Sequence, residues 1–306
     1  MSSLLSAPAR RFLANFAADR TALASFLVVA VFVLAAVFAP LIAPQNPYDP
    51  AQIDIMDSEI PPVWQAGGDP RFLLGSDNQG RDMLSTILYG TGISLLIGVF
   101  AVMMQAVLGV SIGLAAGYLG GRVDAFFMRL ADIQLSLSTL MVAIIALAVF
   151  QGAFGAELYN DLAIIMLILV IGIAEWPQYA RTVRASVLAE KEQMYVDAAK
   201  ALGFSQRRIM FRHLLPNTLS PILVVSTVQV ANAIISEASL SFLGLGMPVT
   251  KPSLGSLIRS GFEFIFSGSW WITIMPAIVL VVLILAINLL GDWLRDVLNP
   301  RLYREN

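Results

Sequence analysis

Residues 270–290 read WWITIMPAIVLVVLILAINLL, and this run carries no charged side chain. A helix needs about 20 predominantly apolar residues to cross the hydrocarbon core of a bilayer. The run has that length and therefore predicts a membrane-spanning helix. Further apolar runs of this kind bring the expected number of spans to six. They lie at 21–43, at 93–119, from after Asp132 through Phe150, from after Asp161 to Tyr179, from after Pro216 to about Leu243, and at 270–290.

The composition of the whole chain points to the same class of protein. Of its 306 residues, 58% are hydrophobic and 13% are charged, and the mean hydropathy is +0.77. An ordinary soluble domain has about 45–50% apolar and about 25% charged residues. This chain has too little polar surface to cover a water-soluble globule. A soluble enzyme and a disordered scaffold are excluded, and we expect an all-α polytopic membrane protein.

The first apolar run, 21–43, has two interpretations. Arg10, Arg11 and Arg20 precede it, as the basic start of a signal peptide would. Signal peptides, however, have an apolar stretch of about 7–15 residues and a small-residue cleavage site. This run is longer and no A-x-A site closes it. We therefore expect a retained membrane anchor.

Lysine and arginine are unevenly distributed between the two sides that six spans define. Fifteen fall on the side of the N-terminus, and four fall on the other side, namely Arg71, Arg81, Lys251 and Arg259. Because basic residues are enriched in cytoplasmic loops, we expect both termini in the cytoplasm. The expected organisation is a cytoplasmic segment (1–20), a first span (21–43), an external segment (44–92), a five-helix core (93–298) with an internal loop (181–216), and a cytoplasmic tail (299–306).

Several kinds of chemistry are excluded by residues that the chain lacks. It has no cysteine and one histidine, His213, so thiolate and two-histidine metal motifs are impossible. A phosphate-binding P-loop needs a lysine directly after a glycine. None of Lys191, Lys200 and Lys251 follows a glycine, so any ATP must be bound by another subunit. We expect no catalytic residue, no metal site and no cofactor in this chain.

The internal loop contains a patterned stretch, residues 195–217, which read YVDAAKALGFSQRRIMFRHLLPN. Residues 196–202 are good helix formers, and Gly203 fits the left-handed position that follows many helices. Ser205 is a suitable N-cap for a second helix, which Pro216 is expected to end. The pattern predicts two short helices joined at a sharp elbow.

This elbow has two possible roles. Its basic residues Arg207, Arg208 and Arg212 would suit a loop lying on the anionic cytoplasmic leaflet. A helix–elbow–helix between two spans is also well shaped to enter a groove of a partner protein. The order of small, apolar and capping residues is more detailed than the first role requires, and it favours the second.

The fifth predicted span carries a polar stripe. Gln229, Asn232, Ser236 and Ser239 recur at helical spacing, and Glu237 flanks them. The stripe would either face a water-filled translocation path or form hydrogen bonds between helices, worth on the order of 1 kcal/mol each. Periodicity alone leaves both readings open.

Other residues in the spans favour packing roles. Asp132 and Glu175 could serve as proton relays, but Arg129 and Arg181 are placed to pair with them. Glycines recur at every fourth position of the second span, which predicts close packing against another helix. These are Gly109, Gly113 and Gly117.

Several motifs resemble one family. The spacing of Asp197-Ala198-Ala199, Gly203 and Leu215-Pro216 resembles the EAA signature of ABC-importer permeases, with Asp in place of the usual Glu. Residues 212–217, RHLLPN, are similar to the form found in the peptide-importer branch. Four further stretches resemble the C-type permeases of dipeptide and oligopeptide importers. They are 74–77 with 80–82, 119–124, 237–246 and 288–292.

That resemblance implies a type I ABC importer permease in the bacterial inner membrane, moving di- or oligopeptides. It implies a second, B-type permease, two ATP-binding subunits, an external substrate-binding protein and surrounding lipid, and no nucleic acid. The ATPase-coupling residues would be Asp197, Ala198, Ala199, Leu202, Gly203, Arg207, His213 and Pro216. The external gate or docking region would include Asp77, Arg81 and Asp82. The assignment of a translocation path to Gln229, Asn232, Ser236 and Glu237 rests on the stripe described above.

Two rival functions follow from the residues. A proton-coupled secondary transporter would work without ATPases and would depend on Asp132 or Glu175. A membrane-embedded enzyme would turn over a substrate as the purified chain alone.

Overall fold

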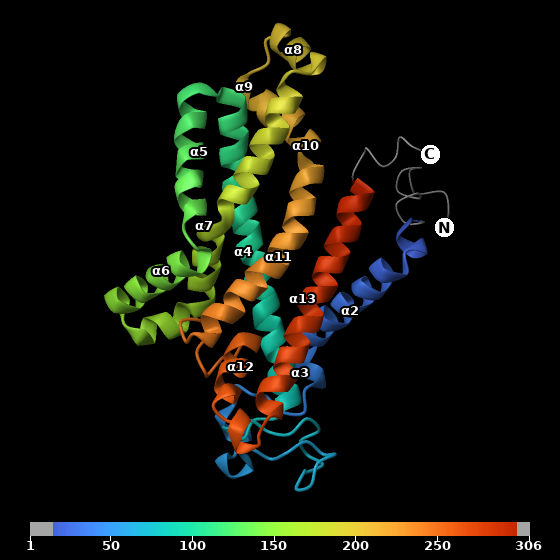
Figure 1. Cartoon of the computed structure of the whole chain (residues 1–306), viewed down its shortest axis with the longest axis vertical. Coiled ribbons are helices and arrows are strands. Elements are labelled where there is room, and N and C mark those ends of the chain that lie inside the picture. Colours follow the sequence, from blue (N-terminus) through green and yellow to red (C-terminus); the bar gives the residue numbers. More distant parts are fainter. Residues whose placement is uncertain (1–14, 299–306) are drawn as a thin grey trace. The chain divides into compact units, whose positions relative to one another are not determined.

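The computed structural model describes residues 15–298, most of which fold into helices (Figure 1). The longer helices are α2 (Arg20–Val37), α4 (Met83–Leu119), α5 (Gly121–Ser136), α6 (Thr139–Phe154), α7 (Ala156–Lys191), α11 (Leu219–Phe242) and α13 (Trp271–Leu298). The shorter ones are α3 (Ala39–Ile42), η1 (Pro50–Gln52), η2 (Ile55–Asp57), α8 (Met194–Ala201), α9 (Gln206–Arg208), the π-helix η3 (Ile209–Leu214), α10 (Leu215–Asn217), α12 (Leu254–Phe262) and η4 (Ile265–Ser267). The expected tail 299–306 and most of the expected segment 1–20 lie outside the described residues.

Within residues 15–298, five helices are long and apolar enough to cross a membrane, namely α2, α4, α7, α11 and α13. A sixth span is formed if α5 and α6 count together, and these two helices meet at a bend of 91°. The predicted third span corresponds to α6, whose 16 residues are fewer than the about 20 that a straight crossing needs. The predicted multi-pass, all-α architecture is confirmed, but the predicted third span is not one straight helix.

The second span begins earlier than the sequence suggests. The predicted start was residue 93, because the stretch up to about Gly92 was interpreted as a loop, but α4 begins at Met83 and runs for 37 residues. The carboxylate of Asp82 accepts a hydrogen bond from the Ser85 amide, 2.7 Å away, and so caps the first turn. A Cβ atom at Gly90 would lie 3.3 Å from the Pro252 carbonyl oxygen. The glycine there allows a close approach of backbones and does not interrupt the helix.

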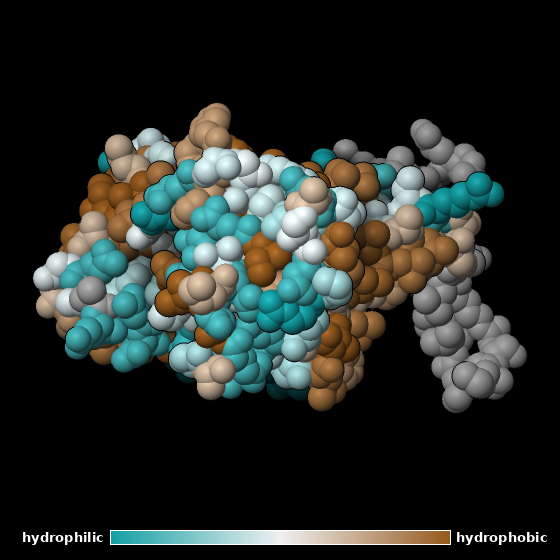
Figure 2. All heavy atoms as spheres, turned by 90° about the horizontal axis from the view of Figure 1, so that it is seen from below, coloured by the Kyte–Doolittle hydropathy of each residue, from teal (hydrophilic) through white to brown (hydrophobic). Residues whose placement is uncertain are grey.

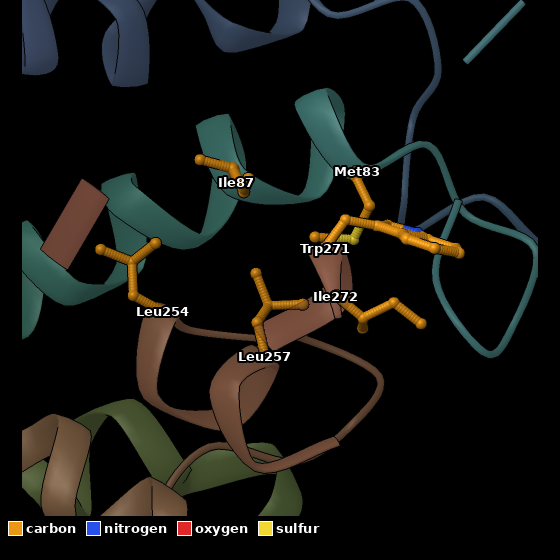
Figure 3. Packing of buried hydrophobic residues seen from close by; sticks show 6 residues of the cluster. All are labelled: Met83, Ile87, Leu254, Leu257, Trp271 and Ile272. Atoms are coloured by element: carbon orange, nitrogen blue, oxygen red, sulfur yellow. The ribbon is translucent and has the colours of Figure 1, made fainter. Parts of the chain in front are cut away.

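The chain divides into two compact units. The first takes in the chain up to Leu96 and again from Glu237. Its core joins the start of α4 to α12 and the start of α13 (Figure 3). The buried side chains at its centre are Met83, Ile87, Leu254, Leu257, Trp271 and Ile272.

The second unit is Ile97–Ser236 and contains most of α4, the helices α5 to α10, and most of α11. Gly109, Gly113 and Gly117 of α4 lie against α7. A Cβ atom at Gly113 would lie 2.6 Å from the Ala180 carbonyl oxygen, and one at Gly117 would lie 2.9 Å from the Val187 Cβ. Real Cβ atoms do not tolerate such distances, so the predicted close-packing face of α4 is confirmed.

Candidate functional site

The segment 194–217 is a helix, a left-handed elbow and a second helical stretch, as predicted. The helix α8 ends in a Schellman motif, in which the amide of Phe204 donates to the Ala199 carbonyl (3.1 Å) and that of Gly203 to the Lys200 carbonyl (2.9 Å). Gly203 has φ +76°, and a Cβ atom there would meet nothing within 4 Å. The glycine is therefore required by backbone conformation and not by space inside this chain.

The second helical stretch differs from the prediction in two respects. Ser205 has the extended N-cap conformation, but its side chain makes no capping hydrogen bond. Pro216 does not end the stretch, because it lies in the first turn of α10, directly after the π-helix η3. The wider π turn lies directly before the turn that contains Pro216. Helical structure then resumes in α11 at Leu219.

Side chains hold the elbow together. The ring of Phe204 stacks on that of His213, with centroids 5.8 Å apart, and the Arg208 guanidinium lies 4.2 Å from the Phe204 ring centroid. The hydroxyl of Tyr195 donates to Glu190 at 2.7 Å and accepts from the Asn217 amide at 2.9 Å. Burial, together with this bond to Glu190, raises the pKa of Tyr195. The elbow is thereby attached to the end of α7.

The surface of α8 is both apolar and charged. Met194 is 88% exposed and Leu202 is 73% exposed. Asp197 pairs with Lys200 at 2.9 Å, and this hydrogen bond raises the pKa of the lysine. The other predicted coupling residues differ in exposure: Ala198 and Arg207 are exposed, whereas Ala199 is buried.

The polar stripe of α11 does not form one exposed face. Gln229 is 1% exposed, and its amide donates to Glu175 of α7 (3.0 Å) and to Gln105 of α4 (3.3 Å). Asn232 is half-buried and donates to the Gln229 carbonyl oxygen at 2.9 Å. Ser236 is also half-buried. Gln229 is enclosed by neighbouring helices here and forms the interhelical hydrogen bonds that were one of the two readings of the stripe.

Glu237 belongs to a separate polar cluster in the first unit. It is fully buried and accepts hydrogen bonds from the hydroxyls of Ser94 (2.8 Å) and Ser241 (2.6 Å). The hydroxyl of Ser253, which caps α12, donates to Ser241 at 3.3 Å. The carboxyl group thus joins α4, α11 and the start of α12, and its side chain faces no open surface of this chain.

The predicted gate residues lie together at the end of the 44–82 segment. Asp77 and Arg81 form a buried ion pair at 2.6 Å, and Arg81 also donates to the Val249 carbonyl at 2.9 Å. Asp82 is buried as well, and this burial raises its pKa. These residues fix the 44–82 segment to the loop after α11 and to the start of α4. They are structural contacts inside the chain.

The glycines and the tryptophan around this ion pair were not recognised from the sequence as structural residues. Gly75 and Gly80 have φ +84° and +78°. A Cβ atom at Gly75 would lie 2.7 Å from the Ile60 carbonyl oxygen and 2.8 Å from the Trp271 indole nitrogen. That nitrogen donates to the Ser76 carbonyl at 3.0 Å. The repeated glycines of the 74–82 motif were a usable signal for such turns.

Glu59 is the residue other than glycine with positive φ (+56°) in the part of the chain that the structure describes. Its amide donates to the Asp77 carbonyl, and its carboxylate accepts from the Ser269 hydroxyl at 2.7 Å. The segment nearby exposes apolar side chains at Ile55, Met56 and Trp64. In Figure 2, viewed from below, hydrophobic residues appear among many hydrophilic ones.

Comparison with known families identifies this arrangement. The model of the inner membrane component of binding-protein-dependent transport systems matches residues 109–304. The chain belongs to this permease family. The model of the N-terminal transmembrane domain of oligopeptide transport permease C matches residues 7–62 of the permease.

Relatives and solved structures agree with that assignment. The permease is 36% identical over 295 residues to the dipeptide transport system permease protein DppC of Haemophilus influenzae, covering 96% of this chain and 95% of that protein. It is 37% identical to the di/tripeptide transport system permease protein DppC of Pseudomonas aeruginosa, covering 96% and 93%. An inward-facing structure of the MetNI methionine ABC transporter has a TM-score of 0.55 at 20% identity, covering 71% of this chain and 98% of that chain. This likeness confirms the predicted ABC importer permease fold.

Proposed function

We propose that this permease is a membrane-spanning subunit of an ATP-driven, binding-protein-dependent importer of di- or oligopeptides. The observation that carries the proposal is its identity of 36–37% to two dipeptide or di/tripeptide permeases across 96% of its own length. The relatives and the family model give no support to a proton-coupled secondary transporter. The chain converts the closure of ATPase subunits into a change of helix arrangement and performs no covalent chemistry.

Two ATP-binding subunits and a second permease of the B type complete the transporter, and an external binding protein delivers the peptide. No lysine of this chain follows a glycine, so the P-loops lie in the ATPase partners. Both termini and the 194–217 segment face the cytoplasm, in agreement with the distribution of basic residues. The 44–82 segment then faces the binding protein.

The 194–217 segment is the part of the permease that contacts an ATPase. Its exposed apolar side chains, Met194 and Leu202, stand beside the charges of Asp197 and Lys200. This mixture suits a groove with an apolar floor and a polar rim. The segment is held to α7 through Tyr195, so pressure on α8 is passed into the bundle.

The remaining predicted residues take distinct roles. Asn232 and Ser236, which are half-buried in this chain, border the path between the two permeases. Asp77, Arg81 and Asp82 shape the external docking region from inside, because they fix its loops and do not touch the peptide.

Reconstitution tests the proposed function directly. The permease is co-expressed with its B-type partner and the two ATPases, purified as a complex and placed in vesicles with the binding protein. We expect labelled dipeptide to accumulate only with ATP and binding protein. Accumulation driven by a proton gradient without the ATPases would overturn the proposal.

A further inference from the structure

Glutamines from three helices converge on one turn of α7, next to the proline inside that helix. The helix runs from Ala156 to Lys191 with Pro177 in its interior. A proline lacks an amide hydrogen, and its ring clashes with the carbonyl four residues earlier, which weakens the turn before it. In a membrane, such a turn persists where neighbouring helices satisfy its polar groups.

Two of these glutamines donate to backbone carbonyls of the turn. The amide of Gln134, on α5, donates to the Ala174 carbonyl at 3.1 Å. The amide of Gln105, on α4, donates to the Ile171 carbonyl at 3.4 Å. Gln105 is fully buried. A buried amide is costly unless it is hydrogen-bonded, so the bond of Gln105 holds its side chain against the turn of α7 that precedes Pro177.

The third glutamine connects this turn to α11. Gln229 donates to the Glu175 carboxyl group at 3.0 Å and to the Gln105 side-chain oxygen at 3.3 Å. On the other side of the proline, the hydroxyl of Tyr179 donates to Ser226 at 2.9 Å. The helix α11 is therefore hydrogen-bonded to α7 both before and after Pro177.

The remaining packing holds the same turn. The side chains of Ala131, Trp176 and Ala180 form a buried cluster. A Cβ atom at Gly172 would lie 2.9 Å from the Met104 side chain. The turn is thus closely surrounded, and the part of α7 after Pro177 leads to Lys191 and the 194–217 segment.

We propose that Gln105, Gln134 and Gln229 are positioning residues that clasp the proline turn of α7, so that movement of the 194–217 segment is passed to α11. This proposal rests on the proposed function of that segment. Without the clasp, the end of α7 moves at the turn before Pro177 and α11 does not follow. Hydrolysis then continues while transport falls.

The test uses the reconstituted importer and measures dipeptide taken up for each ATP hydrolysed. We expect Gln229→Leu and Gln134→Leu to lower this ratio about three- to tenfold, the factor that corresponds to the loss of roughly one interhelical hydrogen bond. The rate of hydrolysis itself should stay within about twofold of the unmodified complex. A variant that merely yields fewer folded complexes does not lower the uptake per ATP hydrolysed, because uptake and hydrolysis then fall together.

The matched control is Gln178→Leu, in the same stretch of α7, where the glutamine is exposed. It should leave the ratio unchanged. Glu175→Gln should also leave it unchanged, because a carboxamide oxygen still accepts from Gln229. If the Gln229→Leu complex fails to assemble, the Gln134→Leu variant provides the test, because Gln134 is half-buried.

The outcomes separate this inference from the proposed function. If the unmodified complex transports and Gln134→Leu keeps the full ratio, the clasp has no role in coupling, while the proposed function stands. If Glu175→Gln abolishes coupling, the charge of Glu175 matters and the clasp is overturned. If the unmodified complex moves no dipeptide with ATP, the proposed function itself fails.

Discussion

The carboxylate of Asp77 and the guanidinium of Arg81 form an ion pair whose side chains are 0% and 2% exposed. The Asp77 carboxylate also accepts hydrogen bonds from the amides of Gln79 (2.8 Å) and Arg81 (2.9 Å). Arg81 in turn reaches the Val249 carbonyl. The pair therefore connects the 44–82 segment to the loop that follows α11.

Removing one partner of this pair should strongly destabilise the permease. Arg81→Ala leaves the Asp77 carboxylate buried without its cation, a change that typically costs about 3–5 kcal/mol. Thermal unfolding of the purified complex measures the loss. The matched control is Arg71→Ala, since Arg71 pairs with Asp57 and Asp69 while 61% exposed, and exposed pairs contribute about 0–1 kcal/mol. Equal shifts of the unfolding midpoint in the two variants would show that the buried pair stabilises the permease no more than the exposed pair does.

Asp82 predicts a dependence of stability on pH. Burial raises its pKa, against the opposing hydrogen bonds from Ser85. The folded state then binds this proton more tightly than the unfolded chain, whose aspartates have a pKa of about 3.9. The stabilising contribution is complete below that value and is lost as the pH rises through the raised folded pKa. Asp82→Asn keeps an acceptor for the cap and should remove the dependence.

Unfolding midpoints measured from about pH 3 to about pH 7 check this prediction. As the pH rises, the unmodified protein should lose stability relative to Asp82→Asn. Asp69 provides a control of opposite sign, because its hydrogen bonds from Arg71 lower its pKa. Its contribution is present above the unfolded value and is lost as the pH falls. Identical pH slopes for Asp82→Asn, Asp69→Asn and the unmodified protein would contradict the assignment.

The absence of cysteine from the chain allows its surfaces to be mapped with single thiols. Cysteine at the half-buried Asn232 or Ser236 should react with a polar thiol reagent if a water-filled path lies beside α11. Cysteine at Gln229 or Ile234 should be protected, since both side chains are buried within this chain. The reaction rates of the four variants give the answer. Equal protection at all four positions would mean that α11 is covered by other helices and borders no water-filled path.

The sequence predicted features that depend on local residue order. Charge-free runs indicated the spans, and the glycine spacing of α4 indicated its close contact with α7. Gly203 was recognised as a left-handed elbow because few other residues adopt that conformation cheaply. The resemblance of the motifs to ABC-importer permeases identified the family that the comparisons confirm.

Features that depend on distant partners could not be predicted in this way. The sequence left open whether Gln229 faces a path or bonds to another helix, because periodicity shows that residues share a face but not what covers it. Its partner Glu175 lies 54 residues earlier in the chain. The early start of α4 was missed for the same reason, since Gly90 faces the backbone near Pro252. The bend between α5 and α6 has no evident local signal.

The elbow at Gly203 gives the sharpest test of coupling. Its φ of +76° penalises a residue with a Cβ atom by roughly 1–2 kcal/mol, and a β-branched residue is a poor substitute at such an angle. A Cβ atom would meet nothing in this chain, so the bundle itself should still fold. We expect Gly203→Val to weaken binding of the ATPases or to uncouple hydrolysis from uptake. Gly203→Asn should retain more activity, because asparagine tolerates a positive φ.

The matched control is Gly155→Val, because Gly155 has φ +82° and equally open space but lies between α6 and α7. Co-purification of the ATPases, together with uptake and hydrolysis by the reconstituted complex, measures all three variants. If Gly203→Val and Gly155→Val behave alike, the elbow is an ordinary strained turn and the transmission of ATPase closure must take place elsewhere.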